Sequence, residues 1–221
     1  MKFKRITLLC GHYGSGKTNV AVNMALKLKE QYENVAIADL DIVNPYFRSK
    51  DSEQDFKNAG IRLICSPYAN SNVDIPALPQ EMYAIVDDLS LRTIIDVGGD
   101  DRGALALGRL SQKIIEENNY EMYMVINCFR PLTRDAISTL EVMKEIETAC
   151  KIKFTALINN SNLGEITTAQ DVLDSVKYAQ EVEKVSGVQL KFTTVKQELY
   201  NELVGKIENL MPLNLQKKLI K

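Results

Sequence analysis

The segment Gly11–Thr18, with the sequence GHYGSGKT, places the strongest constraint on how this chain can fold. It fits the pattern G-x-x-x-x-G-K-[ST] without a substitution. An apolar run, Ile6–Cys10, comes just before it, and residues 20–28 carry apolar side chains at helical spacing after it. A strand, a glycine-rich loop and a helix in this order are the context in which the pattern forms a cradle for phosphate groups. A glycine turn without a ligand is the alternative, and the spacing together with both flanks disfavours it.

The residue types of this segment each supply a contact that a nucleoside triphosphate needs. Glycine lacks a Cβ, so successive backbone N–H groups can turn toward one anion. The helix that we expect to begin at Lys17 adds N–H groups and the positive end of its dipole. The Lys17 ammonium can reach the β- and γ-phosphates, and the Thr18 hydroxyl can bind Mg²⁺. The predicted nucleotide contacts here are Gly11, His12, Tyr13, Gly14, Ser15, Gly16, Lys17, Thr18 and Asn19.

Composition and charge narrow the class of protein. The 221 residues suffice for one α/β domain, and we expect a single domain over residues 1–221. Lys and Arg number 27 against 29 Asp and Glu, and the resulting net charge of −2 does not favour a nucleic-acid surface. The four cysteines are far apart and form no C-x-x-C pair, which argues against a zinc or iron–sulfur site within one chain.

The termini indicate a protein of the cytoplasm. The basic N-terminal residues are followed only by the short run Ile6–Cys10, which is too short for a signal peptide. No apolar stretch approaches the length of a membrane span, so a membrane location is disfavoured. Residues 213–221 mix apolar and basic side chains, and a terminal helix docked on the core is favoured over a helix on a membrane surface.

Runs rich in β-branched residues alternate with longer helical segments, which predicts an α/β fold of three layers with a mostly parallel central sheet of about seven strands. Gly60 and Gly187 are expected to end the helices that precede them. The predicted strands are Ile6–Cys10, Val35–Leu40, Ile61–Cys65, Thr93–Val97, Met122–Asn127, Phe154–Asn159 and Leu190–Thr194. The predicted helices are Lys17–Gln31, Glu53–Asn58, Gln80–Leu89, Ala104–Asn118, Arg134–Cys150, Thr168–Val185 and Lys196–Leu210.

Two predicted strands end in aspartates that suit a Mg²⁺–phosphate site. Alternation along the second strand puts Asp39 and Asp41 on the same side, at the edge where parallel sheets bind ligands. The fourth strand ends at Asp96, which can reach the shell of a metal beside Thr18. Gly99 follows three residues later, where a backbone without a side chain can approach a γ-phosphate. Exposed strand ends often carry aspartate, but this pairing after a phosphate loop favours function.

The sixth predicted strand ends at Asn159 and Asn160, and either amide can pair with adenine because it offers a donor and an acceptor together. A role in turn formation is an equal alternative for both, and Asn160 is the stronger candidate. The N-K-x-D sequence that reads guanine is absent, since Leu163 stands where its aspartate would be. ATP is therefore favoured over GTP.

Together these residues resemble the ParA/MinD/CobQ type of P-loop ATPase, the deviant Walker A, SIMIBI class that includes the nitrogenase iron protein. The resemblance runs from Lys4 to about Asn162 and includes the segment 127–136 after the fifth strand. It implies the P-loop NTPase fold, with the strand that ends at Asp96 adjacent to the strand before the phosphate loop. It also implies residue roles: Lys17 and Asp41 catalytic, with Asp41 positioning the water; Thr18, Asp39, Asp41 and Asp96 around Mg²⁺; and Asn160 beside adenine.

The resemblance has one departure, at the second residue of the loop. Many members carry K-G-G-x-G-K-[ST], whose first lysine reaches the nucleotide of a partner subunit. His12 stands at that position here, and Tyr13 replaces the next glycine. Because imidazole is shorter than a lysine side chain, the lysine mechanism and the dimer that it serves are in question. His12 either contacts phosphate directly or packs on a neighbouring strand.

The leading hypothesis is a Mg-ATP-dependent ATPase of low turnover that acts as a nucleotide-dependent switch on an unidentified protein partner or within a homodimer. Residues 41–51 and 98–103 are the segments that nucleotide would reshape. One alternative is a small-molecule kinase or an ATP-dependent amide or cyclising ligase, in which Tyr46, Phe47 and Arg48 bind a substrate anion. Another is an ATP-binding regulatory module without turnover.

Overall fold

A parallel sheet forms the centre of the computed structural model, which describes residues 2–40, 52–65, 80–99 and 101–215, with the backbone alone at 101 and 102. Within these residues the strand order is β3-β2-β4-β1-β5-β6-β7-β8, and each neighbouring pair runs parallel. The strands are β1 (Ile6–Cys10), β2 (Val35–Leu40), β3 (Arg62–Cys65), β4 (Arg92–Val97), β5 (Tyr120–Ile126), β6 (Ala156–Asn159), β7 (Leu190–Lys196) and β8 (Leu210–Leu213). The predicted class is confirmed, with β8 added to the expected sheet.

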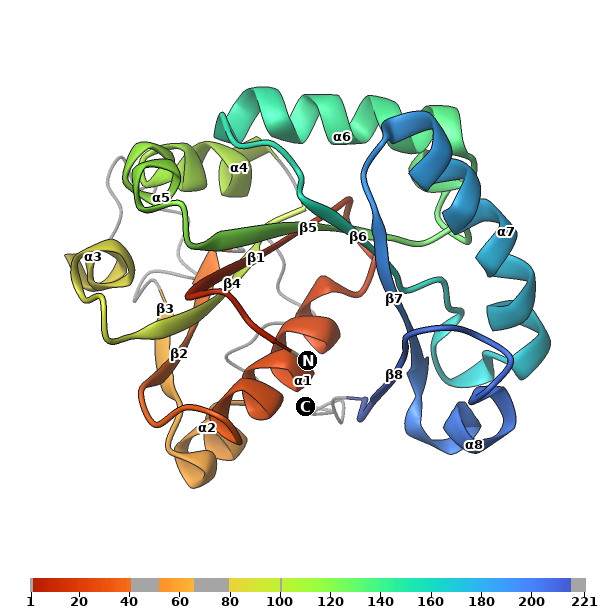
Figure 1. Cartoon of the computed structure of the whole chain (residues 1–221), viewed down its shortest axis with the longest axis horizontal. Coiled ribbons are helices and arrows are strands. Elements are labelled where there is room, and N and C mark those ends of the chain that lie inside the picture. Colours follow the sequence, from red (N-terminus) through yellow and green to blue (C-terminus); the bar gives the residue numbers. More distant parts are fainter. Residues whose placement is uncertain (1, 41–51, 66–79, 100, 216–221) are drawn as a thin grey trace, which may run out of the picture.

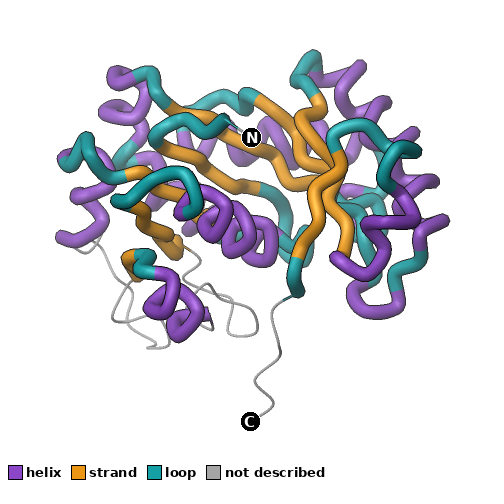
Figure 2. The backbone as a smooth tube through the Cα atoms, turned by 60° about the horizontal axis from the view of Figure 1, so that its bottom comes forward, coloured by secondary structure: helices purple, strands orange, loops and turns teal. Residues whose placement is uncertain are grey.

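Helices cover both faces of this sheet and make the fold three-layered (Figures 1 and 2). The helices are α1 (Lys17–Lys29), α2 (Glu53–Ala59), α3 (Gln80–Asp87), α4 (Asp101–Gly108), α5 (Ser111–Glu117), α6 (Ala136–Cys150), α7 (Ala169–Ser186) and α8 (Tyr200–Leu203), with short 3₁₀ turns η2 (Pro131–Thr133), η3 (Gly164–Ile166) and η4 (Gln197–Leu199). α1 and α2 pack on one face, while α3 to α7 pack on the other.

The central strands are buried on both faces, which explains their nearly continuous apolar sequences. In β1, Ile6 and Leu8 belong to the core under α3 to α7, whereas Leu9 belongs to the core under α1. β4 lies directly beside β1, as the resemblance implied. Because the strands are parallel, their carboxyl ends lie at one edge of the sheet, and the loops that follow them meet there.

Local sequence signals account for four of the helix ends. Asp135 caps α6 in a capping box with Ser138, and Thr168 caps α7 in the same way with Asp171. Gly187, with a φ of 70°, follows the end of α7 as predicted, and Gly60 does the same for α2. Most other predicted boundaries differ from the structure by one or two residues.

The predicted helix Lys196–Leu210 is wrong. β7 continues to Lys196, α8 covers only Tyr200–Leu203, and the chain then forms β8 beside β7. Gly205 and Asn209 have φ values of 85° and 51°, which a helix cannot contain. Leu203 and Ile207, which are four residues apart, pack into a small core with α7.

The predicted helix Ala104–Asn118 is two helices, α4 and α5. The Leu110 N–H donates to Leu107 O at 2.9 Å in the tight turn between them. Gly108 ends α4 where a Cβ would lie 3.2 Å from Ala149 O of α6, so a close approach of two helices fixes this break.

The expected terminal helix is absent from residues 213–215, which continue from β8, and residues 216–221 lie outside the described part of the chain. No described helix is both long enough and apolar enough to cross a membrane.

The four cysteines are free thiols, and Cys10 and Cys150 are buried. Burial raises the pKa of the Cys10 thiol well above its usual range; the neighbouring Cys150 adds to this rise, and the Lys17 ammonium opposes it. Burial also raises the pKa of Cys128 and of Cys150. These thiols are therefore neutral near pH 7, as expected of cysteines that serve packing.

Candidate nucleotide-binding site

The loop between β1 and α1 has a backbone that only a glycine-rich sequence adopts easily. Gly16 precedes the helix with a φ of 85°, and a Cβ there would collide with the amide nitrogen of Asn160. The Ser15 N–H donates to His12 O at 3.1 Å and closes a turn. Lys17 is buried, and its Nζ bends back toward the same His12 carbonyl at 3.5 Å. The loop therefore surrounds the lysine ammonium.

The N-terminus of α1 carries no side-chain cap. Gly16 supplies no hydrogen bond from a side chain, and the first turn contains no acidic residue. α2 and α5 likewise lack a side-chain cap, whereas α6 and α7 are capped by their own residues. The helix dipole, behind a glycine-rich loop, favours an anion at the start of α1.

Asp39 and Asp96 lie side by side near the carboxyl ends of β2 and β4, where they are partners in register. Both are buried. Ile37 and Ile94, two residues before each, pack in the core under α1, so alternation places both carboxylates on the α1 face. Asp96 is also the register partner of Leu9, so it lies near the end of β1.

This donor set suits Mg²⁺. Magnesium is usually held by one or two carboxylates together with phosphate oxygens and water. Asp39, Asp96 and the buried Thr18 hydroxyl supply such donors around one end of α1. No cluster of three His, Cys, Asp or Glu side chains able to hold a metal by itself occurs among the described residues. The predicted fourth donor and catalytic residue, Asp41, lies outside the described residues.

The backbone after β4 touches the phosphate loop. A Cβ on Gly99 would lie 2.6 Å from Tyr13 N and 3.0 Å from Lys17 Nζ, so glycine permits this contact. Gly103, in the first turn of α4, is packed equally tightly, since its Cβ would lie 2.6 Å from Gly98 N. The end of β4 therefore contacts both the phosphate loop and the start of α4.

Asn160 holds the phosphate loop from the side of β6. Its Nδ2 donates to Ser15 O at 2.6 Å, and its Oδ1 accepts from Thr194 Oγ1 at 2.5 Å. Because the peptide unit is planar and trans, the N–H of Gly16 points away from Asn160. Asn159 faces the other way and donates to Ser175 Oγ of α7 at 2.9 Å. This placement favours a packing role for Asn159 and leaves Asn160 at the loop.

Arg130 is a loop contact that the sequence reasoning did not single out. Its Nε donates to Gly14 O at 2.8 Å from the segment after β5. Asn127, fully buried at the end of β5, accepts from the N–H groups of Phe129 and Asn162 and thereby joins the β5 and β6 loops. The sequence signal for this contact was the position of Arg130, four residues after the end of β5, the strand that pairs with β1.

His12 and Tyr13 form the outer part of the loop. The Nδ1 of His12 lies 3.1 Å from Tyr13 O. The Tyr13 side chain is 53% exposed. Neither side chain fills the place of a second loop lysine, and a phosphate contact by His12 stays a prediction.

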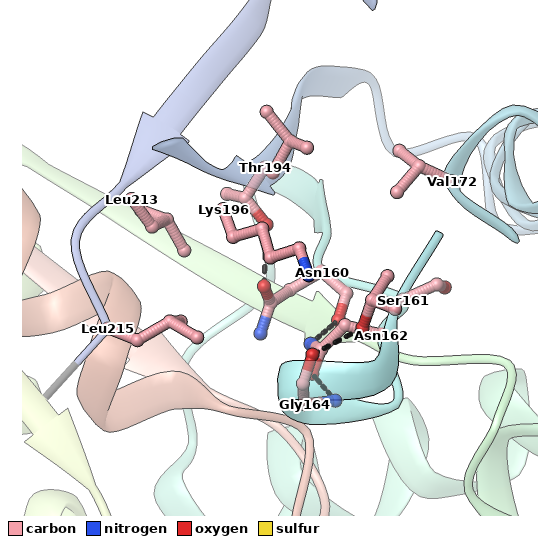
Figure 3. A pocket seen from close by; sticks show the side chains of 11 residues that line it. Asn160, Ser161, Asn162, Gly164, Val172, Thr194, Lys196, Leu213 and Leu215 are labelled. Atoms are coloured by element: carbon pink, nitrogen blue, oxygen red, sulfur yellow. Dashed lines mark hydrogen bonds between the residues drawn. The ribbon is translucent and has the colours of Figure 1, made fainter. Parts of the chain in front are cut away.

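A small cavity of about 20 Å³ lies beside Asn160. Figure 3 shows Leu213 and Leu215 on one side of Asn160, with Asn162 and Gly164 on the other. Thr194 and Lys196, at the end of β7, complete the wall. Asn160 therefore contacts both the phosphate loop and this cavity.

No family model matches the sequence, and no curated protein matches it. Solved structures match the fold. FtsY from Mycoplasma mycoides gives a TM-score of 0.56 at 18% identity over 86% of this chain and 59% of that chain. Cell division protein FtsY from Thermotoga maritima gives a TM-score of 0.56 at 16% identity, over 89% of this chain and 63% of that chain. Signal recognition particle 54 kDa protein from Aeropyrum pernix, in complex with GDP, gives 0.53 at 18% identity, over 87% and 41%.

At these identities the likeness shows the fold, which is that of P-loop NTPases. The chain spans about three fifths of the length of the two FtsY structures. None of the three proteins is ParA or MinD, so the narrower resemblance stays a prediction.

The hydrogen bonds of Asn160 can be tested by mutation. We expect Asn160→Ala to lower the free energy of unfolding by about 1–3 kcal/mol, because Ser15 O and Thr194 Oγ1 lose a buried partner. Of the two hydrogen bonds of Asn160, Thr194→Val removes the one to Asn160 Oδ1, so it should lower the free energy of unfolding by less. Urea denaturation of both variants and of the double variant measures the coupling, and strictly additive losses would contradict a shared network.

Proposed function

We propose that the protein binds Mg-ATP in the loop between β1 and α1, hydrolyses it slowly and uses it as a switch for a protein partner. The observation that carries the proposal is the glycine-rich loop at the start of α1, with Lys17 buried and the carboxylates of Asp39 and Asp96 in register on the α1 face of the sheet. Phosphate would supply the anion that the start of α1 favours, and Mg²⁺ would offset the two carboxylates.

The chain's own groups divide the work of hydrolysis. The loop amides and Lys17 hold the β- and γ-phosphates and stabilise the charge that develops as the terminal phosphate leaves. Asp41, by its resemblance, orients the attacking water. Thr18, Asp39 and Asp96 would hold Mg²⁺, which when bound supplies charge neutralisation on the phosphate oxygens. Asn19 and Gly99 are further proposed contacts.

ATP is favoured over GTP by the chemistry of the base side. Guanine presents paired N–H donors for which a carboxylate is the natural acceptor. No described residue that lines the cavity beside Asn160 carries a carboxylate, and Leu163 occupies the position of the guanine-reading aspartate. GTP is the alternative, because the matching 54 kDa protein holds GDP.

The surface around the loop suits a protein partner. Large apolar side chains follow the carboxyl ends of β1, β5 and β6, and so they lie at the same edge of the sheet as the phosphate loop. They are Tyr13, Leu132, Ile137, Leu163 and Ile166, and Ile137 and Ile166 are 73% and 76% exposed. We name these five side chains the apolar rim. Exposed apolar groups gathered at one edge are typical of interaction surfaces, and a second copy of the chain or another protein would cover them.

A small-molecule kinase or ligase is the second candidate, and a module without turnover is the third. Tyr46, Phe47 and Arg48, the predicted substrate contacts, lie outside the described residues. ATP turnover that rises with added protein but not with small metabolites supports the switch. Tight binding without turnover supports the third candidate.

We expect ATP to bind at least roughly tenfold more tightly than GTP, since the described lining of the base side offers no carboxylate to guanine's paired donors. Competition against a fluorescent adenine nucleotide measures both affinities. Lys17→Ala is the control and should lose both nucleotides, because the buried ammonium is removed. A preference for GTP would refute the assignment of ATP.

Asp41→Ala should retain ATP binding and lose about a hundredfold in turnover, because the water loses its orienting carboxylate. Phosphate release at saturating ATP, with affinity measured in parallel, separates the two effects. Equal turnover in the variant and the parent would remove Asp41 from the mechanism.

Gly99→Ala should weaken ATP about tenfold and leave ADP unchanged, because its Cβ would press on Tyr13 N and Lys17 Nζ beside the γ-phosphate position. ADP serves as the matched control within the same variant. Equal losses for ATP and ADP would contradict a γ-phosphate sensor at Gly99.

A further inference from the structure

The C-terminal residues Leu213–Leu215, which we call the strap, join the cavity beside Asn160 to helix α1. Leu213 ends β8 opposite Lys196 and is buried in the core under α1. The backbone of Asn214 then pairs with the side chain of Asn23. Its N–H donates to Asn23 Oδ1 at 2.9 Å, and its carbonyl accepts from Asn23 Nδ2 at 2.9 Å.

The side-chain amide of Asn23 forms hydrogen bonds both to the strap and to the first turn of α1. Its Nδ2 also donates to Asn19 O at 2.8 Å, so both N–H groups and the oxygen have partners. The side chain is 5% exposed and lies among apolar neighbours on α1. A buried amide costs free energy without such partners. What the amide adds is a fixed position of the strap against the phosphate-binding helix.

The strap also forms the apolar wall of the cavity. Leu213 and Leu215 face a polar wall that contains Asn160 and Asn162 (Figure 3). The cavity of about 20 Å³ has room for about one water molecule, so a purine ring needs more space. Leu213 is held by the pairing of β8 with β7, whereas Leu215 is 40% exposed, so Leu215 is the side chain that gives way and then packs on the ring.

We propose that Asn23 is a positioning residue for the base of the nucleotide: it clamps the strap so that Leu215 packs against the purine. The clamp spans from the helix that binds the phosphates to the cavity that receives the base. The affinity for the base therefore depends on the position of α1 relative to the strap. This inference rests on nucleotide binding as proposed above.

Asn23→Leu tests the clamp with two ligands, ATP and inorganic tripolyphosphate, which has no base. We expect the ATP dissociation constant to rise about tenfold, for the two hydrogen bonds that hold the strap, and that of tripolyphosphate to stay unchanged. Isothermal titration measures both constants, and thermal unfolding of the same sample reports the stability. A merely structural role would weaken both ligands together.

Two further variants separate the strap from α1. Asn214→Ala keeps the backbone groups that Asn23 binds, so its affinity for ATP should match the parent. Leu215→Ser leaves α1 untouched and should weaken ATP but not tripolyphosphate. Parallel losses for both ligands, or unchanged ATP affinity in Asn23→Leu and Leu215→Ser, would overturn the inference alone. A parent chain that binds neither ligand would overturn the proposed function and the inference together.

Discussion

The rest of the site depends on one constraint: α1 begins in the middle of the sheet edge without a cap of its own. Side chains from the neighbouring loops donate hydrogen bonds to carbonyl groups on the outer side of the phosphate loop that precedes α1. Arg130 binds Gly14 O, and Asn160 binds Ser15 O. Since each peptide unit is planar, a carbonyl fixed on one side fixes the following N–H on the other. The loop's capacity for anions is thus determined by contacts from the β5 and β6 loops as much as by its glycines.

The parallel sheet brings the remaining groups to the same place. The register of β2 with β4 sets Asp39 beside Asp96, and the end of β4 carries Gly99 onto Tyr13 and Lys17. α4 follows within a few residues and is packed on Gly98 through Gly103. A γ-phosphate between Lys17 and Gly99 would therefore act on a loop that is continuous with a helix, which is the requirement for a switch.

The sequence was sufficient wherever the signal is local. The glycine pattern, the apolar strands and the helix ends at Gly60 and Gly187 depend on a few adjacent residues, and the order of layers follows from their alternation. The C-terminal region was mispredicted because the spacing of Leu203 and Ile207 resembles a helix, while Gly205 and Asn209 bend the chain into β8. No local pattern could show that a tertiary contact would extend the sheet.

In the site, too, residues in a local motif were predictable from the sequence, whereas residues that act through tertiary contacts were not. Lys17 and Thr18 are identified by a motif, but Arg130 and Asn23 act across 116 and 191 residues of sequence, on Gly14 and Asn214. Asn159 and Asn160 are equivalent in composition and differ only in the face of β6 from which each projects. Such contacts require the register of the strands, which a single sequence does not contain.

The loops that hold the phosphate loop also carry the apolar rim. The segment after β5 bears Arg130, Leu132 and Ile137, and the segment after β6 bears Asn160, Leu163 and Ile166. In the proposed switch, a partner that packs on the rim presses on the residues that fix Gly14 O and Ser15 O. By thermodynamic linkage, if partner binding changes the nucleotide affinity by some factor, nucleotide binding changes the partner affinity by the same factor. In the proposed switch, Asn160 and Arg130, which hold Ser15 O and Gly14 O, would carry this coupling in place of a second loop lysine.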